Sequence, residues 1–165
     1  LKAMICTKVD PSFAARSPRD YRLTNNGGYM IELIRPEPRP AWRAMAGIEP
    51  VDADGMVGVP VMGLQWLVNA PAVEAVVIDE RGFPAPMRCP DPRFWAAHKL
   101  WLSRRDDREP VRKGRDRAQA VAVVRLVRER LPHLPIDDAF LAVLPAMLRA
   151  AFAAGDSSPR GAPEW

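Results

Sequence analysis

The sequence predicts an α+β protein with a β-rich first part and a helical second part. Before Cys89-Pro90-Asp91-Pro92 the apolar runs are short and are separated by glycine and proline, which is typical of strands and turns. After that point the apolar residues recur with a helical period. We therefore expect a β-rich part over residues 1–90, a helical bundle-like layer over residues 91–155 and a disordered tail over residues 156–165.

Two regions of the first part predict strands. Asn25-Asn26-Gly27-Gly28 is a turn signal, because Asn and Gly accept positive φ, and it predicts a hairpin between residues 21–24 and 29–34. The second strand of this hairpin is almost wholly apolar, so we expect it to be covered on both faces. A short strand over residues 57–62 and a short helix over residues 63–69 are expected further along.

Prolines shape the rest of the first part. Pro36, Pro38 and Pro40 lack backbone donors and predict an irregular loop over residues 36–56. A second hairpin is expected from residues 75–78 and 83–87, with the turn over residues 79–82. Its second arm contains Pro84 and Pro86, which restricts that arm to an edge strand.

Three helices are predicted in the second part. The first begins with Asp91 as N-cap and Pro92 at the first helical position. The second runs from Gly114 or Arg115 to Leu131, and the third runs from Asp137 to Gly155 with a kink at Pro145. The apolar stripe of the first helix consists of Phe94, Trp95, His98, Trp101 and Leu102. We expect Trp101 to be largely buried where the helices pack against the β-rich part.

Composition limits the classes of protein that the chain can represent. With 165 residues, 48% of them hydrophobic, the chain can bury a core. Cys6 and Cys89 show no CxxC spacing, which argues against a zinc site. No apolar run is long enough to cross a membrane and no signal peptide is recognised, so we expect a cytoplasmic protein without a membrane partner.

The net charge of +4 has a local origin, because arginine and lysine are concentrated over residues 93–130. Such a segment attracts nucleic acid, nucleotide phosphates or an acidic membrane surface, or it is an ordinary solvated helix face. Arg104, Arg105 and Lys113 belong to this cluster, whereas Asp106, Asp107 and Glu109 partly neutralise it. The charge pattern is therefore not that of a continuous basic segment that simply binds nucleic acid.

Individual residues in both parts are candidates for chemistry. Glu32 lies in an apolar strand, where a carboxylate either holds a metal ion or faces solvent at a sheet edge. Lys99, at the border of the apolar stripe, either contacts a triphosphate or is an exposed lysine. His98 lies on the stripe itself and is interpreted as a packed core histidine. Asp116 either favours the dipole of its helix or orients Lys99 or an arginine.

Several catalytic motifs are missing from the sequence. There is no P-loop, GxGxxG, HExxH or GxSxG pattern, and no Gly-Ser or Gly-Gly turn is followed by Asp-x-Asp. Asp52-Ala53-Asp54 has the Asp-x-Asp form, but no strand-like apolar residues flank it. We interpret it as a solvated loop and keep its two acids as the next candidates for a metal site.

Segments of the chain follow one another in a recognisable order. The ordered set resembles bacterial nucleotidyltransferase-fold proteins of the DNA polymerase beta-like superfamily, and the resemblance covers about residues 9 to 150. The segments that carry it are Val9-Asp10-Pro11-Ser12-Phe13, Gly28 to Pro36, Pro60 to Leu67, Asp91 to Leu100, Arg104-Arg105 and Lys113 to Gln119.

The resemblance implies a mixed β-sheet with flanking helices and transfer of a nucleotide from an NTP by two metal ions, suspected to be Mg²⁺. Glu32 then matches the third metal-binding acid of the superfamily, and Lys99 matches a helix lysine suited to the triphosphate. Arg104, Arg105, Lys113 and Asp116 complete the expected nucleotide-binding set. The strand with the first two acids would lie upstream of Leu1, so the chain looks like the C-terminal portion of such an enzyme.

The predicted function is therefore metal-dependent transfer of a nucleotide from an NTP to an acceptor that is RNA, protein or a small molecule. Two other readings stay open. The first is a non-catalytic binding module, a degenerate nucleotidyltransferase, which the missing Asp-x-Asp turn favours. The second is a helical nucleic-acid-binding protein, which the cluster around Arg104 favours.

Overall fold

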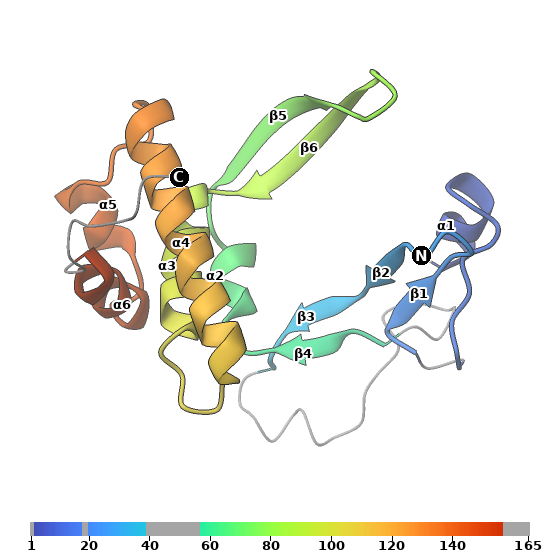
Figure 1. Ribbon diagram of the computed structural model, residues 1–165, viewed down its shortest axis with the longest axis horizontal. Helices are drawn as coiled ribbons and strands as arrows, with labels where there is room; N and C mark the ends of the chain where they lie inside the picture. Colours follow the sequence, from blue (N-terminus) through green and yellow to red (C-terminus); the bar gives the residue numbers. More distant parts are fainter. Residues whose placement is uncertain (1, 18–19, 39–56, 157–165) are drawn as a thin grey trace. The chain divides into compact units, whose positions relative to one another are not determined.

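The computed structural model describes residues 2–17, 20–38 and 57–156 and confirms the α+β class. The chain forms two compact units, Leu1–Gln65 and Trp66–Trp165 (Figure 1). We expected the chain to divide between residues 90 and 91, where the apolar period changes. The contacts between residues instead group the second hairpin with the helices. Within the described ranges the strands form three separate two-stranded sheets, where one mixed sheet was expected.

The first unit contains one helix and two small sheets. Strand β1 (Arg22–Thr24) pairs antiparallel with β2 (Met30–Glu32), and β3 (Ile34–Pro36) pairs parallel with β4 (Val59–Val61). Helix α1 (Lys2–Lys8), which was not predicted, precedes them. The buried core of this unit is small and consists of Ile5, Phe13 and Leu23.

Two expectations for the first unit are wrong. Strand β2 is not covered on both faces, because Met30 and Glu32 are exposed on its two-stranded sheet. Regular structure does not stop before Pro36, which is the last residue of β3. A proline is tolerated there because it ends a strand that pairs on one side with β4 alone. The expected loop over residues 36–56 otherwise lies mostly outside the described residues.

The predicted turn between β1 and β2 is confirmed and is tied to the segment before it. Gly28 has φ 80°, and the side-chain oxygen of Asn25 accepts from Tyr29 N at 2.7 Å. The amide of Asn25 donates to Asp10 at 2.8 Å, and Ser12 N donates to the other Asp10 oxygen at 2.8 Å. The backbone bond from Ser12, and then the side chains of Ser12 and Asn25, lower the pKa of Asp10.

The second unit contains a hairpin and most of the helices. The boundary between the units falls inside helix α2 (Leu64–Val68), which leads into the antiparallel strands β5 (Ala72–Ile78) and β6 (Pro84–Pro90). Helices α3 (Pro92–Leu102), α4 (Pro110–Arg130), α5 (Asp138–Val143) and α6 (Ala146–Asp156) follow. Helix α3 packs against both α4 and α6. The buried core of this unit consists of Phe94, Ala96, Ala97, Leu100, Trp101, Ala120, Phe140, Leu144, Leu148, Ala151 and Phe152.

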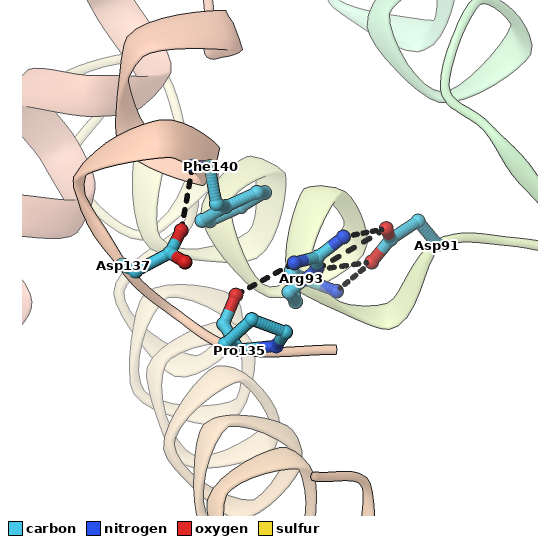
Figure 2. Close-up of polar contacts among 5 residues, drawn as sticks. All are labelled: Asp91, Arg93, Pro135, Asp137 and Phe140. Carbon is cyan, nitrogen blue, oxygen red and sulfur yellow. Dashed lines mark hydrogen bonds and ion pairs between the residues drawn. The ribbon is translucent and has the colours of Figure 1, made fainter. Parts of the chain in front are cut away.

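The beginning of α3 is fixed by a buried carboxylate, as Figure 2 shows. Asp91 is 2% exposed, accepts from Arg93 N at 2.8 Å as the predicted N-cap, and pairs with the Arg93 guanidinium at 2.7 Å. The same guanidinium donates to Pro135 O at 2.6 Å and lies over the ring of Phe140. Asp137 caps α5 by accepting from Phe140 N. This network joins the start of α3 to the chain before α5.

The helix boundaries differ from the prediction at two prolines. Helix α4 begins at Pro110, after Glu109, because proline is favoured at the first helical position. Gly114, which was predicted near the start of the helix, therefore lies inside it. The predicted single helix over residues 137–155 is two helices, α5 and α6. Leu144 is extended and Pro145 separates them, because proline removes the backbone donor that a continuous helix needs. The expected disordered tail lies outside the described residues beyond Asp156.

The β5–β6 hairpin confirms the second predicted turn, with Gly82 at φ 85°. Asp79 N donates to Phe83 O, so the alternate positions of β6 direct their backbone groups outward. Pro84, Pro86 and Pro90 occupy these positions, which confirms the expected edge strand. Within the described part of the chain, no helix has both the length and the apolar composition to cross a membrane.

Candidate functional site

The cationic residues predicted to bind a nucleotide gather where α3 ends and α4 begins. Helix α3 ends at Leu102, and the backbone N–H of its C-cap Ser103 donates to Lys99 O. A short segment then reaches Pro110 at the first turn of α4. The packing of α3 against α4 places residues of the two helices in contact across this corner. We call residues 99–117 of this arrangement the α3–α4 corner.

The centre of the α3–α4 corner is the carboxylate of Asp116, which is fully buried. Lys99 Nζ donates to Asp116 Oδ1 at 2.8 Å, and Arg108 donates to Asp116 Oδ2 at 2.7 Å. Burial alone would raise the pKa of Asp116, but the hydrogen bonds and charges of Lys99 and Arg108 outweigh it and lower that pKa. Asp116 therefore stays ionised and holds two cations, in agreement with the alternative that it orients Lys99 or an arginine.

Lys99 has two partners within the protein. Its ammonium group pairs with Asp116 and lies 5.3 Å from the centre of the Trp95 ring. Its side chain is 18% exposed, so it is not the freely solvated lysine of the alternative reading. Reaching a triphosphate would require Lys99 to leave a buried carboxylate, which is costly because that charge would lose a partner.

Other cations of the α3–α4 corner have acidic partners close by in the chain. Arg105 pairs with Asp107 and lies 4.8 Å from the centre of the Trp101 ring. Arg112 pairs with Glu109 at 2.8 Å, one helical turn away. These pairs confirm that acids partly neutralise the cluster.

A pocket opens beside the buried Asp116 network. Its volume is about 210 Å³, and its lining contains three cationic side chains and no carboxylate. Arg104 and Lys113, both expected to bind a nucleotide, contribute to it, whereas Lys99, Arg105 and Asp116 do not. The lining residues are Leu100, Ser103, Arg104, Lys113, Gly114 and Arg117.

Glu32, the predicted metal-binding acid, has a very different environment in the first unit. It lies directly opposite Arg22 in the β1–β2 ladder, and Arg22 Nη2 donates to its carboxylate at 2.5 Å. The Glu32 side chain is 42% exposed and that of Arg22 is 33% exposed. The hydrogen bond to Glu32 raises the pKa of Arg22. The carboxylate is thus accessible to solvent but has a cation as its nearest partner.

The described carboxylates do not assemble a metal site. Within residues 2–17, 20–38 and 57–156, no three His, Cys, Asp or Glu side chains come together in a group that could hold an ion. Asp52 and Asp54 lie outside the described residues. Glu32 and Lys99 belong to different units.

His98 and Trp101 fill the core of the second unit. His98 is 5% exposed and Trp101 is 9% exposed, which confirms that both are buried. The Trp66 ring meets Trp101 edge-to-face at 4.8 Å and His98 at 6.3 Å. Trp101 is therefore buried against helix α2 inside this unit.

Sequence reasoning missed two contributions to the α3–α4 corner. Arg108, read as one cation among many, binds Asp116 in the buried network. Arg117 lies four residues after Lys113, so the two side chains share a face of α4, and this spacing was a usable signal. The start of α4 was placed too late, which left Lys113 outside the predicted helix.

The described molecule is thus an α+β protein with a cationic pocket between two helices. A family model described as "Nucleotidyltransferase" matches residues 3–145. This match covers most of the chain, and the protein belongs to that nucleotidyltransferase family. No curated protein and no solved structure matches the chain significantly.

Proposed function

We propose that this protein takes part in metal-dependent transfer of a nucleotide from an NTP to an acceptor. The observation that carries the proposal is the family match over residues 3–145, which implies a nucleotide substrate. The cationic lining of the pocket in the α3–α4 corner is consistent with a phosphate-bearing ligand. The bacterial origin and the cytoplasmic location stay predictions from the sequence.

The α3–α4 corner supports this function through fixed positive charge. A triphosphate carries several negative charges, and catalysis of nucleotidyl transfer depends on positioning and on stabilising these charges. Asp116 neutralises part of the charge of Lys99 and Arg108 and holds both side chains in place. Arg104 and Lys113, which line the pocket, would supply charge that a phosphate group can meet directly.

The proposed Mg²⁺ requirement means that acidic side chains of the protein must hold the ion. Mg²⁺ is held by one or more carboxylates together with substrate phosphates. Glu32 would have to exchange its contact with Arg22 for the ion and would need further acids beside it. Because the described carboxylates do not fit a complete site, we assign no step of the reaction to the ion. Asp52 and Asp54 are the first candidates within this chain for the missing acids.

The test is a transfer assay with the full-length protein. Labelled NTPs and Mg²⁺ are supplied with RNA, protein or small-molecule acceptors, and incorporation of label and release of pyrophosphate are measured. Glu32→Gln keeps the shape of the side chain but removes its charge, so we expect transfer to fall to background. Glu37→Gln is the matched control, since Glu37 is an exposed acid of the same unit. Wild-type turnover in Glu32→Gln would remove Glu32 from the site.

A non-catalytic binding module is the second candidate function. It is favoured by the absence of an assembled metal site among the described residues. In that case the protein would bind NTPs, and no acceptor would become labelled under any metal or nucleotide condition. Binding measured by calorimetry beside the transfer assay therefore separates the two functions.

The third reading, a helical nucleic-acid-binding protein, is less well supported by the charges. Arg105, Arg108 and Arg112 each pair with a carboxylate of the same corner, which lowers the positive field that a phosphate backbone would meet. Binding through phosphates weakens steeply as salt increases. Absent or salt-independent binding of single-stranded and duplex oligonucleotides would remove this reading.

A further inference from the structure

The pocket of the α3–α4 corner has a composition suited to an anion. Arg104, Lys113 and Arg117 contribute three positive charges to its lining, and no carboxylate lines it. The C-terminal end of α3 opposes them with only about half an elementary charge. Asp107 also lies near enough to Lys113 to sense its charge, but the hydrogen bond from Arg105 is the larger cause of its lowered pKa. The described lining residues of the pocket are therefore cationic or uncharged.

Arg104 lines the pocket and also contacts helix α6. One of its terminal nitrogens donates to Ala150 O in helix α6 at 3.4 Å. A guanidinium has five N–H donors in a rigid plane, so this single contact leaves other donors for a ligand.

Gly114 is the second unusual feature of the pocket. It lies inside helix α4, where glycine is less stable than alanine by about 1 kcal/mol. Its backbone does not need glycine, since Gly28, Gly63 and Gly82 are the positive-φ glycines among the described residues. Packing does not need it either, because an added Cβ would have no atom within 4 Å. The missing side chain of Gly114 leaves open space at the pocket wall.

The size of the pocket limits the part of a ligand that it can take. Its volume of about 210 Å³ is below the range of about 300–1,000 Å³ that is typical for sites enclosing a whole small molecule. A charged group of a larger ligand fits this description better than a complete nucleotide. Glycine allows such a group to approach the helix backbone closely.

We propose that this pocket binds the phosphate chain of the nucleotide, with Arg104 and Lys113 as its charged contacts and Gly114 as the wall. Lys99 and Asp116 then act as a support that fixes the two helices and not as ligands. The identification of the anion as part of a nucleotide rests on the proposed function. The proposal that the pocket binds an oligophosphate does not depend on that function.

The experiment measures binding of inorganic tripolyphosphate to the full-length protein by calorimetry at low salt and without divalent metal. Wild type is expected to bind. Lys113→Gln and Arg104→Gln are each expected to weaken binding by about tenfold, as for loss of one charge-assisted hydrogen bond. Arg115→Gln is the matched control, because Arg115 is an exposed cation of the same helix that does not line the pocket.

Gly114→Ala gives the sharpest test, since a structural and a binding role predict different outcomes. The added methyl group fits the protein and suits a helix, so the melting temperature should rise. The same group fills space at the pocket wall, so tripolyphosphate binding should fall by about tenfold or more. Unchanged binding in Gly114→Ala would overturn the proposal. Equal weakening by Arg115→Gln and Lys113→Gln, or no binding by wild type, would also overturn it.

Competition identifies the source of the phosphates. An NTP is expected to displace tripolyphosphate, whereas displacement by an oligonucleotide and not by an NTP would contradict the nucleotide assignment. If tripolyphosphate binds as expected but no transfer occurs in any assay, the proposed reaction fails and the phosphate site stands. If transfer occurs and Gly114→Ala leaves binding and transfer unchanged, the proposed reaction stands and the phosphate site fails.

Discussion

The carboxylates of Asp116 and Glu32 contrast two regions of the molecule. Asp116 in the α3–α4 corner is fully buried and holds Lys99 and Arg108 at hydrogen-bonding distance. Glu32 in the β1–β2 ladder is 42% exposed and has Arg22 as its cross-strand partner. A buried carboxylate with two cations has little freedom to meet a ligand, whereas an exposed one can exchange its partner. The comparison separates a carboxylate that supports a site from one that is still available for chemistry.

The difference arises from what each element packs against. Helix α3 packs against both α4 and α6, and Asp116 of α4 is fully buried beside Lys99 of α3. The β1–β2 sheet has only two strands and a core of three buried residues, so its outer face stays in solvent. A surface ion pair on such a sheet contributes about 0–1 kcal/mol, whereas breaking a buried pair costs about 3–5 kcal/mol.

The largest expected effect tests the packing that surrounds Asp116. Trp101→Ala removes a side chain that is 9% exposed and stacked edge-to-face on Trp66. We expect a loss of about 3–5 kcal/mol in the free energy of unfolding, as for truncation of a core aromatic. Denaturant unfolding measures it. A loss below about 1 kcal/mol would show that the helical core does not depend on this residue.

The next effect concerns the buried network itself. Asp116→Asn keeps the shape of the side chain but leaves Lys99 and Arg108 without their shared negative partner. We expect a loss of about 2–4 kcal/mol in the free energy of unfolding, below the full value for a buried pair because both cations are partly exposed. Chemical denaturation of both proteins at pH 7 measures the loss. If Asp116→Asn left the free energy of unfolding unchanged, Asp116 would contribute as little to stability as the exposed Glu32 is expected to.

The pH dependence provides a control for the Asp116 prediction. The pKa of Asp116 is lower in the folded protein than its usual value, so the unfolded chain takes up a proton first as the pH falls. The stabilisation is fully present above the unfolded pKa of about 3.9 and is lost as the pH falls through the folded pKa. The stability gap between wild type and Asp116→Asn should therefore be constant between pH 7 and about pH 5 and narrow below about pH 4.

The smallest expected effect on stability belongs to Glu32. Glu32→Gln weakens a solvent-exposed contact with Arg22, so the free energy of unfolding should change by less than about 1 kcal/mol. Thermal unfolding at low and high salt measures this change. A loss as large as that of Asp116→Asn would mean that the Arg22–Glu32 pair is structural, and the contrast between the two regions would fail.

The sequence by itself determined the local features whose causes lie within a few residues. The α+β class, the turn at Gly28, the Asp91 cap before Pro92 and the edge-strand character of β6 all follow from backbone preferences of Gly, Asp and Pro. The burial of His98 and Trp101 also followed from helical period alone.

Only the tertiary structure decided which charged residues meet. Asp116 lies 17 residues after Lys99 and 8 after Arg108, and neither separation predicts a contact until α3 and α4 are packed together. The same packing brings Arg104 and Arg117 to one pocket, and it withdraws Lys99 into the protein. Charge patterns along the chain carry no information on burial, because burial depends on the elements that cover a residue from elsewhere in the fold.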